Sequence, residues 1–91
     1  MSHQLPDTVE KYSQSRPFTE TTTPPNFQKN HSTRSGVWGR LVMESGSLAF
    51  AWEGDDAHLN LSAGDAVIIP PEASHRVILN GPVSFIVEFY R

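Results

Sequence analysis

Alternation of apolar and polar side chains is the feature that most constrains this chain, and it begins near Val37. In residues 47–53 apolar side chains recur at every second position, which is the period of a β-strand with one buried face and not that of a helix. Four further short apolar runs follow, at residues 57–62, 66–70, 75–79 and 83–90. Strands of this length at about ten-residue spacing predict a β-sandwich or a β-barrel.

Turn residues separate these expected strands. The sequence Gly-Asp-Asp at 54–56 predicts a hairpin between its two neighbouring strands. Ala-Gly-Asp at 63–65 and Asn-Gly-Pro at 80–82 predict two further turns, and a stiff loop is expected at 70–74. On this interpretation the strands at 75–79 and 83–90 are separate elements.

The first 36 residues have a different composition. They carry six apolar side chains and four of the seven prolines, together with a threonine-rich run at 19–23. A segment this polar and this often interrupted by proline predicts an irregular arm with one or two short edge strands. For residues 1–8, disorder is the alternative. We expect residues 1–91 to form a single domain, because a chain of 91 residues has no room for a second core.

Composition excludes several classes of protein. The chain has no cysteine, which excludes disulfides, cysteine-ligated zinc and thiol catalysis. Its net charge of −3 disfavours nucleic acid and anionic membrane surfaces as partners. No apolar run approaches the length of a membrane span and no secretory signal is visible, so we expect a cytoplasmic protein. So small a core also predicts support from a bound metal or from a homodimer contact.

The segment from Gly64 to His75 is the most informative for function. A glycine–aspartate turn, an apolar strand, Pro70 and a histidine five residues later predict that the chain crosses the rim of a barrel and that His75 points inward. A neutral imidazole in that position is suited to a divalent metal. The segment resembles the second sequence signature of the cupin superfamily, with Glu72 at a position where that signature usually has glycine.

The first cupin signature is present only at its end, in residues 40–48. Upstream of it the chain offers one histidine, His31, and Thr33 stands where the signature has a second ligand. The sequence of residues 31–41, where the chain departs from the signature, and that of residues 71–77 together resemble the tellurite-resistance-related small cupin family. Members of that family occur alone or as the N-terminal module of tellurite-resistance methyltransferases.

The resemblance implies an all-β, cupin-like fold, that is, a double-stranded β-helix or jelly-roll forming a conical barrel with an irregular N-terminal arm. It also implies a homodimer and a physiological setting of tellurite and oxidative stress. The methyltransferase chemistry of the fused proteins would lie in a domain that these residues do not contain.

Three residues form the candidate metal site. His31, Glu72 and His75 make a two-histidine, one-carboxylate set if the arm folds over the mouth of the barrel. Such a set suits Zn, Fe(II), Mn or Ni and leaves coordination positions open for water or substrate. The alternative is that each of them is an ordinary surface or core side chain.

Three further residues are candidates for binding a ligand. Arg34 and Arg40 are cations near the expected mouth that can hold an anion, and Trp38 can line a cavity. Surface ion pairing is the alternative for the arginines, and packing in the core or at a dimer interface is the alternative for the tryptophan.

The sequence therefore predicts a cupin-like barrel that binds a divalent metal and a small anionic molecule. A metal-dependent enzyme of the dioxygenase or hydrolase type is one alternative, because open metal positions can activate dioxygen or water. A metal-free dimerisation or docking barrel is the other. Fold alone does not decide among them.

Overall fold

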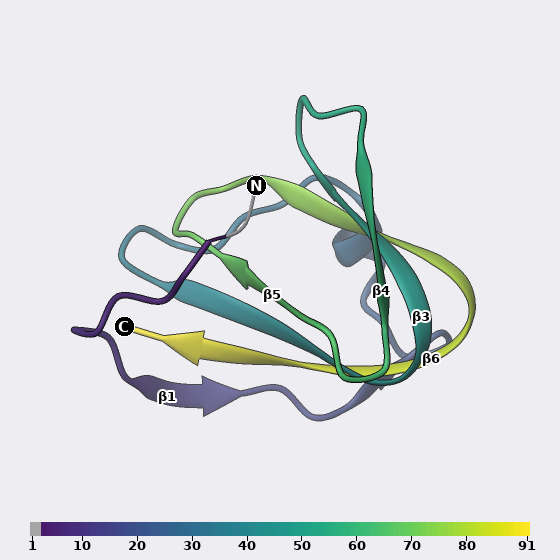
Figure 1. Cartoon of the computed structure of the whole chain (residues 1–91), viewed down its shortest axis with the longest axis horizontal. Helices are drawn as coiled ribbons and strands as arrows, with labels where there is room; N and C mark the ends of the chain where they lie inside the picture. Colours follow the sequence, from purple (N-terminus) through teal and green to yellow (C-terminus); the bar gives the residue numbers. More distant parts are fainter. Residues whose placement is uncertain (1–2) are drawn as a thin grey trace.

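The computed structural model describes residues 3–91, which form a six-stranded sheet folded over into a barrel (Figure 1). No helix in these residues is long and apolar enough to cross a membrane. The elements are β1 (Lys11–Gln14), β2 (Phe18–Thr19), the short 3-10 helix η1 (Pro25–Gln28), β3 (Trp38–Trp52), β4 (His58–Ser62), β5 (Ala66–Ile69) and β6 (His75–Tyr90).

The two long strands β3 and β6 organise the sheet, because they pair with each other in antiparallel fashion along most of their length. Residues 38–43 pair with 85–90, and residues 48–52 pair with 75–79. The register shifts at 43–45 and again at 46–48, so both strands bend there and pass from one half of the barrel to the other. β5 extends the first half of β3, and β4 extends the second half.

Gly46 makes this bend possible. Its φ is +71°, and a Cβ atom built on it would lie 2.1 Å from the carbonyl oxygen of Pro82. Only glycine fits so close to the backbone of β6 with this conformation. The prediction of a turn at 80–82 is wrong, because β6 continues through Gly81 and Pro82 and bends there without reversing.

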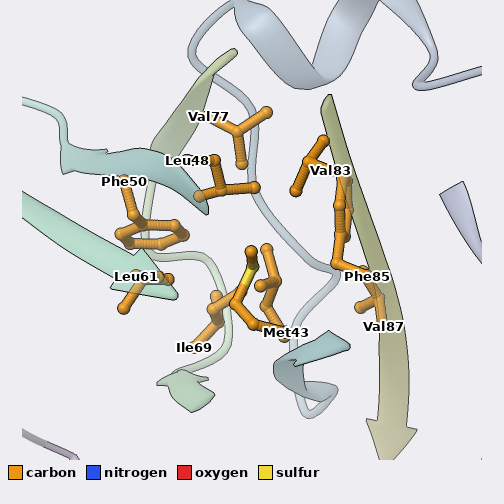
Figure 2. Close-up of a cluster of buried hydrophobic side chains, with 10 residues drawn as sticks. Met43, Leu48, Phe50, Leu61, Ile69, Val77, Val83, Phe85 and Val87 are labelled. Carbon is orange, nitrogen blue, oxygen red and sulfur yellow. The ribbon is translucent and has the colours of Figure 1, made fainter. Parts of the chain in front are cut away.

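The core lies between the two halves of the barrel. Phe50 and Phe85 have no exposed surface, and Figure 2 shows both rings among the aliphatic side chains of the facing strands. The members of this cluster are Leu41, Met43, Leu48, Phe50, Leu61, Ile69, Val77, Val83, Phe85 and Val87. Most of them recur at every second position of a strand, as the alternation in the sequence requires.

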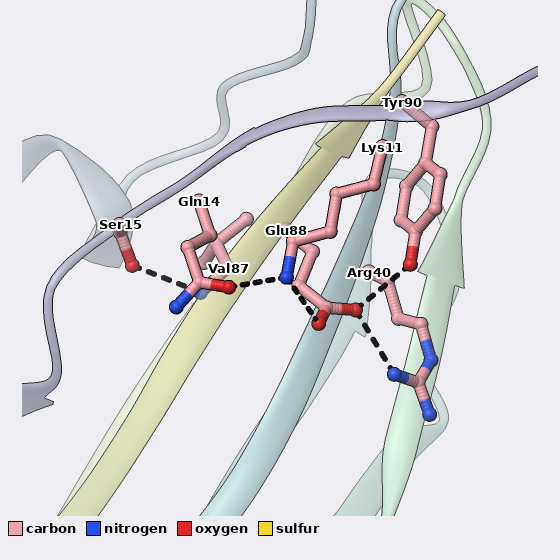
Figure 3. Close-up of polar contacts among 7 residues, drawn as sticks. All are labelled: Lys11, Gln14, Ser15, Arg40, Val87, Glu88 and Tyr90. Carbon is pink, nitrogen blue, oxygen red and sulfur yellow. Dashed lines mark hydrogen bonds and ion pairs between the residues drawn. The ribbon is translucent and has the colours of Figure 1, made fainter.

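The N-terminal arm contributes two short edge strands, as expected, and both pair with β6. Glu88 anchors β1 from the outer face of the sheet (Figure 3). Its carboxylate lies 3.2 Å from Nζ of Lys11 and 2.9 Å from a guanidinium nitrogen of Arg40, and it accepts a hydrogen bond of 3.0 Å from the hydroxyl of Tyr90. Burial by itself raises the pKa of Glu88, but the hydrogen bonds from Arg40, Lys11 and Tyr90 hold that pKa below its usual range.

Candidate functional site

A cavity of about 710 Å³ lies between the arm and the inner face of the barrel. This volume falls in the range of roughly 300–1,000 Å³ that is typical of small-molecule sites. The barrel side of the cavity is apolar and is formed by Leu41, Ile69, Val77, Val87 and Phe89. The arm side is formed by Tyr12, Ser13, Asn26, Phe27 and residues 31–37.

Two histidines, one from each side, meet in this cavity. The backbone N–H of His31 donates to the carbonyl oxygen of His75 over 3.0 Å, and the N–H of His75 donates back over 2.9 Å. This isolated antiparallel bridge fixes the arm against the first residue of β6. The two imidazole centroids are 4.3 Å apart, and both residues line the cavity.

Both imidazoles have the same tautomer when neutral. Nδ1 of His31 is 2.9 Å from the carbonyl oxygen of Lys29, and Nδ1 of His75 is 2.8 Å from that of Ala73. A carbonyl oxygen only accepts, so each Nδ1 carries the hydrogen and each Nε2 keeps its lone pair. The site therefore combines two preset acceptor atoms on adjacent rings.

His75 is held in its neutral form by its surroundings. Only 4% of its surface is exposed, and its ring is stacked on Phe50 with centroids 5.2 Å apart. Burial is the main cause that lowers the pKa of His75 from 6.5 to about 4. The hydrogen bond to Ala73 acts in the opposite direction and raises this pKa, while the charge of His31 lowers it further. At neutral pH the His75 ring is an acceptor and not a cation.

Glu72 does not join the two histidines. It is exposed, it has a φ of +61° and it does not line the cavity; its backbone N–H donates to the carbonyl oxygen of Thr33 over 3.2 Å. Within residues 3–91 no three histidine, cysteine, aspartate or glutamate side chains are grouped so as to hold a metal. Protein zinc sites use three or four protein ligands, so the residues brought together here supply two of them.

The candidate ligand-binding residues separate into two groups. Arg34 lines the cavity. Arg40 and Trp38 alternate with the inward-facing Gly39 and Leu41 along β3, so they lie on the outer face, where Arg40 binds Glu88. Neither of them lines the cavity.

The sequence-based interpretation missed two cavity residues, one in the edge strand β1 and one directly after β6. Arg91 lies with its Cζ atom 4.0 Å from the centroid of the Tyr12 ring, and both residues line the cavity. Alternation offered a signal for Arg91, since it stands two residues after Phe89, on the same side of the strand. No such signal existed for Tyr12, because β1 is exposed throughout and shows no apolar pattern.

Solved structures share this barrel. A protein from E. coli (strain K12) superposes with a TM-score of 0.86 at 20% sequence identity, covering 98% of this chain and 96% of that chain. A cupin-2 domain containing protein from Shewanella frigidimarina superposes with a TM-score of 0.56 at 15% identity, covering 88% of this chain and 64% of that chain. At these identities the likeness shows the fold, which is cupin-like, as expected.

TehB from Haemophilus influenzae is more similar in sequence. It superposes with a TM-score of 0.82 at 29% identity, covering 92% of this chain, and this chain spans 32% of TehB. No curated protein matches the chain by sequence. The model of the TehB-like domain family matches residues 13–87, which include the arm from Ser13 onward, His31 and His75, and most of β6. The chain therefore belongs to the TehB-like domain family, and its barrel is a small cupin-like domain related to tellurite resistance.

Proposed function

We propose that this domain is a binding module that holds a small molecule inside the barrel, against the imidazole rings of His31 and His75. The family relation suggests tellurite and related oxidative stress as its physiological setting. The observation that carries the proposal is the pair of histidines with one fixed tautomer at a cavity of ligand size.

The chemistry of the pair favours a ligand that donates hydrogen bonds at this end of the cavity. Each neutral ring has its Nε2 lone pair available, and His75 keeps that form because its pKa is lowered to about 4. A hydroxyl or N–H group on the ligand would donate a hydrogen bond to an Nε2 atom, while the apolar wall would pack against the rest of the ligand.

A divalent metal at the same two atoms is the second candidate. Metal-binding histidines commonly donate their other ring N–H to a carbonyl oxygen, which orients the ring, and both histidines make this bond. A Zn, Fe, Mn or Ni ion would then complete its coordination with water or with the bound molecule, because residues 3–91 bring only two such ligands together.

Binding of phenol, measured by amide chemical shifts of the ¹⁵N-labelled protein, tests the first proposal. Phenol carries an apolar ring and one strong hydrogen-bond donor, and toluene has nearly the same shape without the donor. We expect phenol to shift the amides of Leu41 and Val77 and to bind at least about fivefold more tightly than toluene.

Variants locate the phenol site. His31→Ala and His75→Ala should each weaken phenol binding, whereas His58→Ala, which changes an exposed histidine of β4, should leave it unchanged. The proposal is wrong if phenol shifts only amides outside the cavity, or if the two cavity variants bind it as the wild type does.

A further inference from the structure

The cavity has a charge opposite to that of the chain as a whole. The chain carries ten acidic and seven basic residues. Among the described residues that line the cavity there is no aspartate or glutamate, but there are two arginines, Arg34 and Arg91. In a chain with net charge −3, a cavity wall whose charged side chains are all cationic is a local reversal of sign, and these side chains attract anions.

Both guanidinium groups are available for a ligand. Within residues 3–91 the ion pairs join Glu88 to Lys11 and to Arg40, on the outer face of the sheet. Neither Arg34 nor Arg91 has a carboxylate partner there. Arg91 is instead positioned over the face of Tyr12, which restricts the side chain without neutralising its charge.

The barrel side of the cavity disfavours a bare inorganic ion. Leu41, Ile69, Val77, Val87 and Phe89 offer no donors from their side chains, so an ion held among them would lose its hydration without replacement. An apolar group placed there instead removes apolar surface from water on both sides.

We infer that the cavity selects a small organic anion, with a carboxylate at Arg34 and Arg91 and an apolar body against the inner face of β3, β5 and β6. The inference rests on the proposed function and names the ligand class for the same cavity. A guanidinium group binds a carboxylate through two parallel hydrogen bonds, which a neutral group of the same shape does not reproduce.

Matched pairs of probes test this inference. Benzoate and hexanoate carry the charge and an apolar body, benzamide and hexanamide keep the body without the charge, and acetate and inorganic phosphate keep a charge without the body. We expect amide shifts in the cavity to show that benzoate or hexanoate binds about tenfold more tightly than its amide and than acetate or phosphate. Raising the salt concentration should weaken benzoate more than benzamide.

Three arginine variants test which arginines bind the carboxylate of the ligand. Arg34→Gln and Arg91→Gln should each weaken benzoate about tenfold and bring it close to benzamide, which should itself be unaffected. Arg76→Gln is the matched control. Arg76→Gln also removes one positive charge, but from the face of β6 opposite His75 and Val77. It should therefore leave benzoate binding unchanged.

The outcomes separate this inference from the proposed function. If benzamide, acetate or phosphate binds as tightly as benzoate, the inference of an organic anion is wrong, while the proposal that the cavity binds a small molecule stands. If phenol binds at the histidines and none of the anions binds, the inference alone fails. If neither phenol nor any of these probes shifts the amides of the cavity, both proposals fail.

Discussion

His31 and His75 are joined twice, through the backbone and through their rings. Their backbones exchange hydrogen bonds of 3.0 and 2.9 Å, and their imidazole centroids are 4.3 Å apart. The bridge brings a residue of the N-terminal arm onto β6, which supplies four of the ten core residues. A change in the packing of the arm is therefore also a change in the cavity that we propose as the binding site.

The free energy of unfolding should fall as the pH is lowered from 7 to 4, because of His75. The folded pKa is about 4 and the ordinary value is 6.5, so between these values the unfolded chain binds a proton that the folded chain does not. From pH 7 down to pH 4 this group alone should cost up to roughly 3 kcal/mol of stability, and the stability that it supports is complete only above about pH 6.5. Urea unfolding across this range, in chelator, measures the effect.

His75→Asn provides the comparison for that measurement. Asparagine can keep the hydrogen bond to the carbonyl of Ala73 and does not titrate, so its unfolding free energy should fall less between pH 7 and pH 4 than that of the wild type. His58→Asn, at an exposed histidine, should follow the wild type. Parallel pH profiles for His75→Asn and the wild type would contradict the lowered pKa.

Gly46→Ala should strongly destabilise the barrel. The new Cβ would collide with the carbonyl oxygen of Pro82, in addition to the strain of a positive φ. We expect a loss of at least about 3 kcal/mol, seen as a lower midpoint of thermal unfolding or as loss of the cooperative transition. Gly54→Ala is the control, because Gly54 has a φ of +82° and open space around its Cβ position, and it should cost about 1 kcal/mol. Equal effects of the two substitutions would show that the close approach at Gly46 is unimportant.

The strand pattern from β3 onward could be predicted from the sequence because the inner face of these strands is apolar. Leu48 and Phe50 are both in the core, and the edge strands of the arm are also present. The continuity of β6 could not be predicted in this way. Asn-Gly-Pro at 80–82 has the composition of a reversal, and whether it reverses or bends depends on the close approach of Pro82 and Val83 to Gly46, a contact between residues far apart in the sequence.

Those residues of the candidate site that lie in strands with alternating apolar side chains could be predicted from the sequence. His75 shares a face with Val77, and the structure buries both. Glu72 lies in a loop, where a φ of +61° sets the direction of the chain, and no periodic pattern predicts that conformation. Tyr12 enters the cavity through the pairing of β1 with β6, which is also a long-range contact.

Glu88→Gln should loosen the attachment of β1. It removes the charge that holds Lys11 and Arg40, whose side chains are 39% and 38% exposed, so solvent screens both pairs and the expected loss is only about 1 kcal/mol. The effect should be concentrated in the arm, as faster amide hydrogen exchange in residues 11–14 than in the wild type. Asp56→Asn, at an exposed turn residue, is the control. Unchanged exchange in β1 would contradict the anchoring role of Glu88.

Zinc titration distinguishes the two-histidine arrangement from the three-ligand set that the sequence predicts. The structure places His31 and His75 at the cavity and leaves Glu72 exposed outside it. If the metal is held by the imidazoles, His31→Ala and His75→Ala should each lower zinc affinity at least about tenfold in calorimetry. Glu72→Gln should change it by less than about twofold, because the carboxylate is absent from the cavity.

Each other result of the zinc titration has one meaning. A loss with Glu72→Gln as large as with the histidine variants would mean that the loop closes on the metal and that the two-histidine arrangement is incomplete. No zinc bound by the wild type, and no metal by elemental analysis after Fe(II), Mn and Ni are offered, would exclude metal binding. The histidine pair would then act through its Nε2 lone pairs as acceptors for the ligand alone.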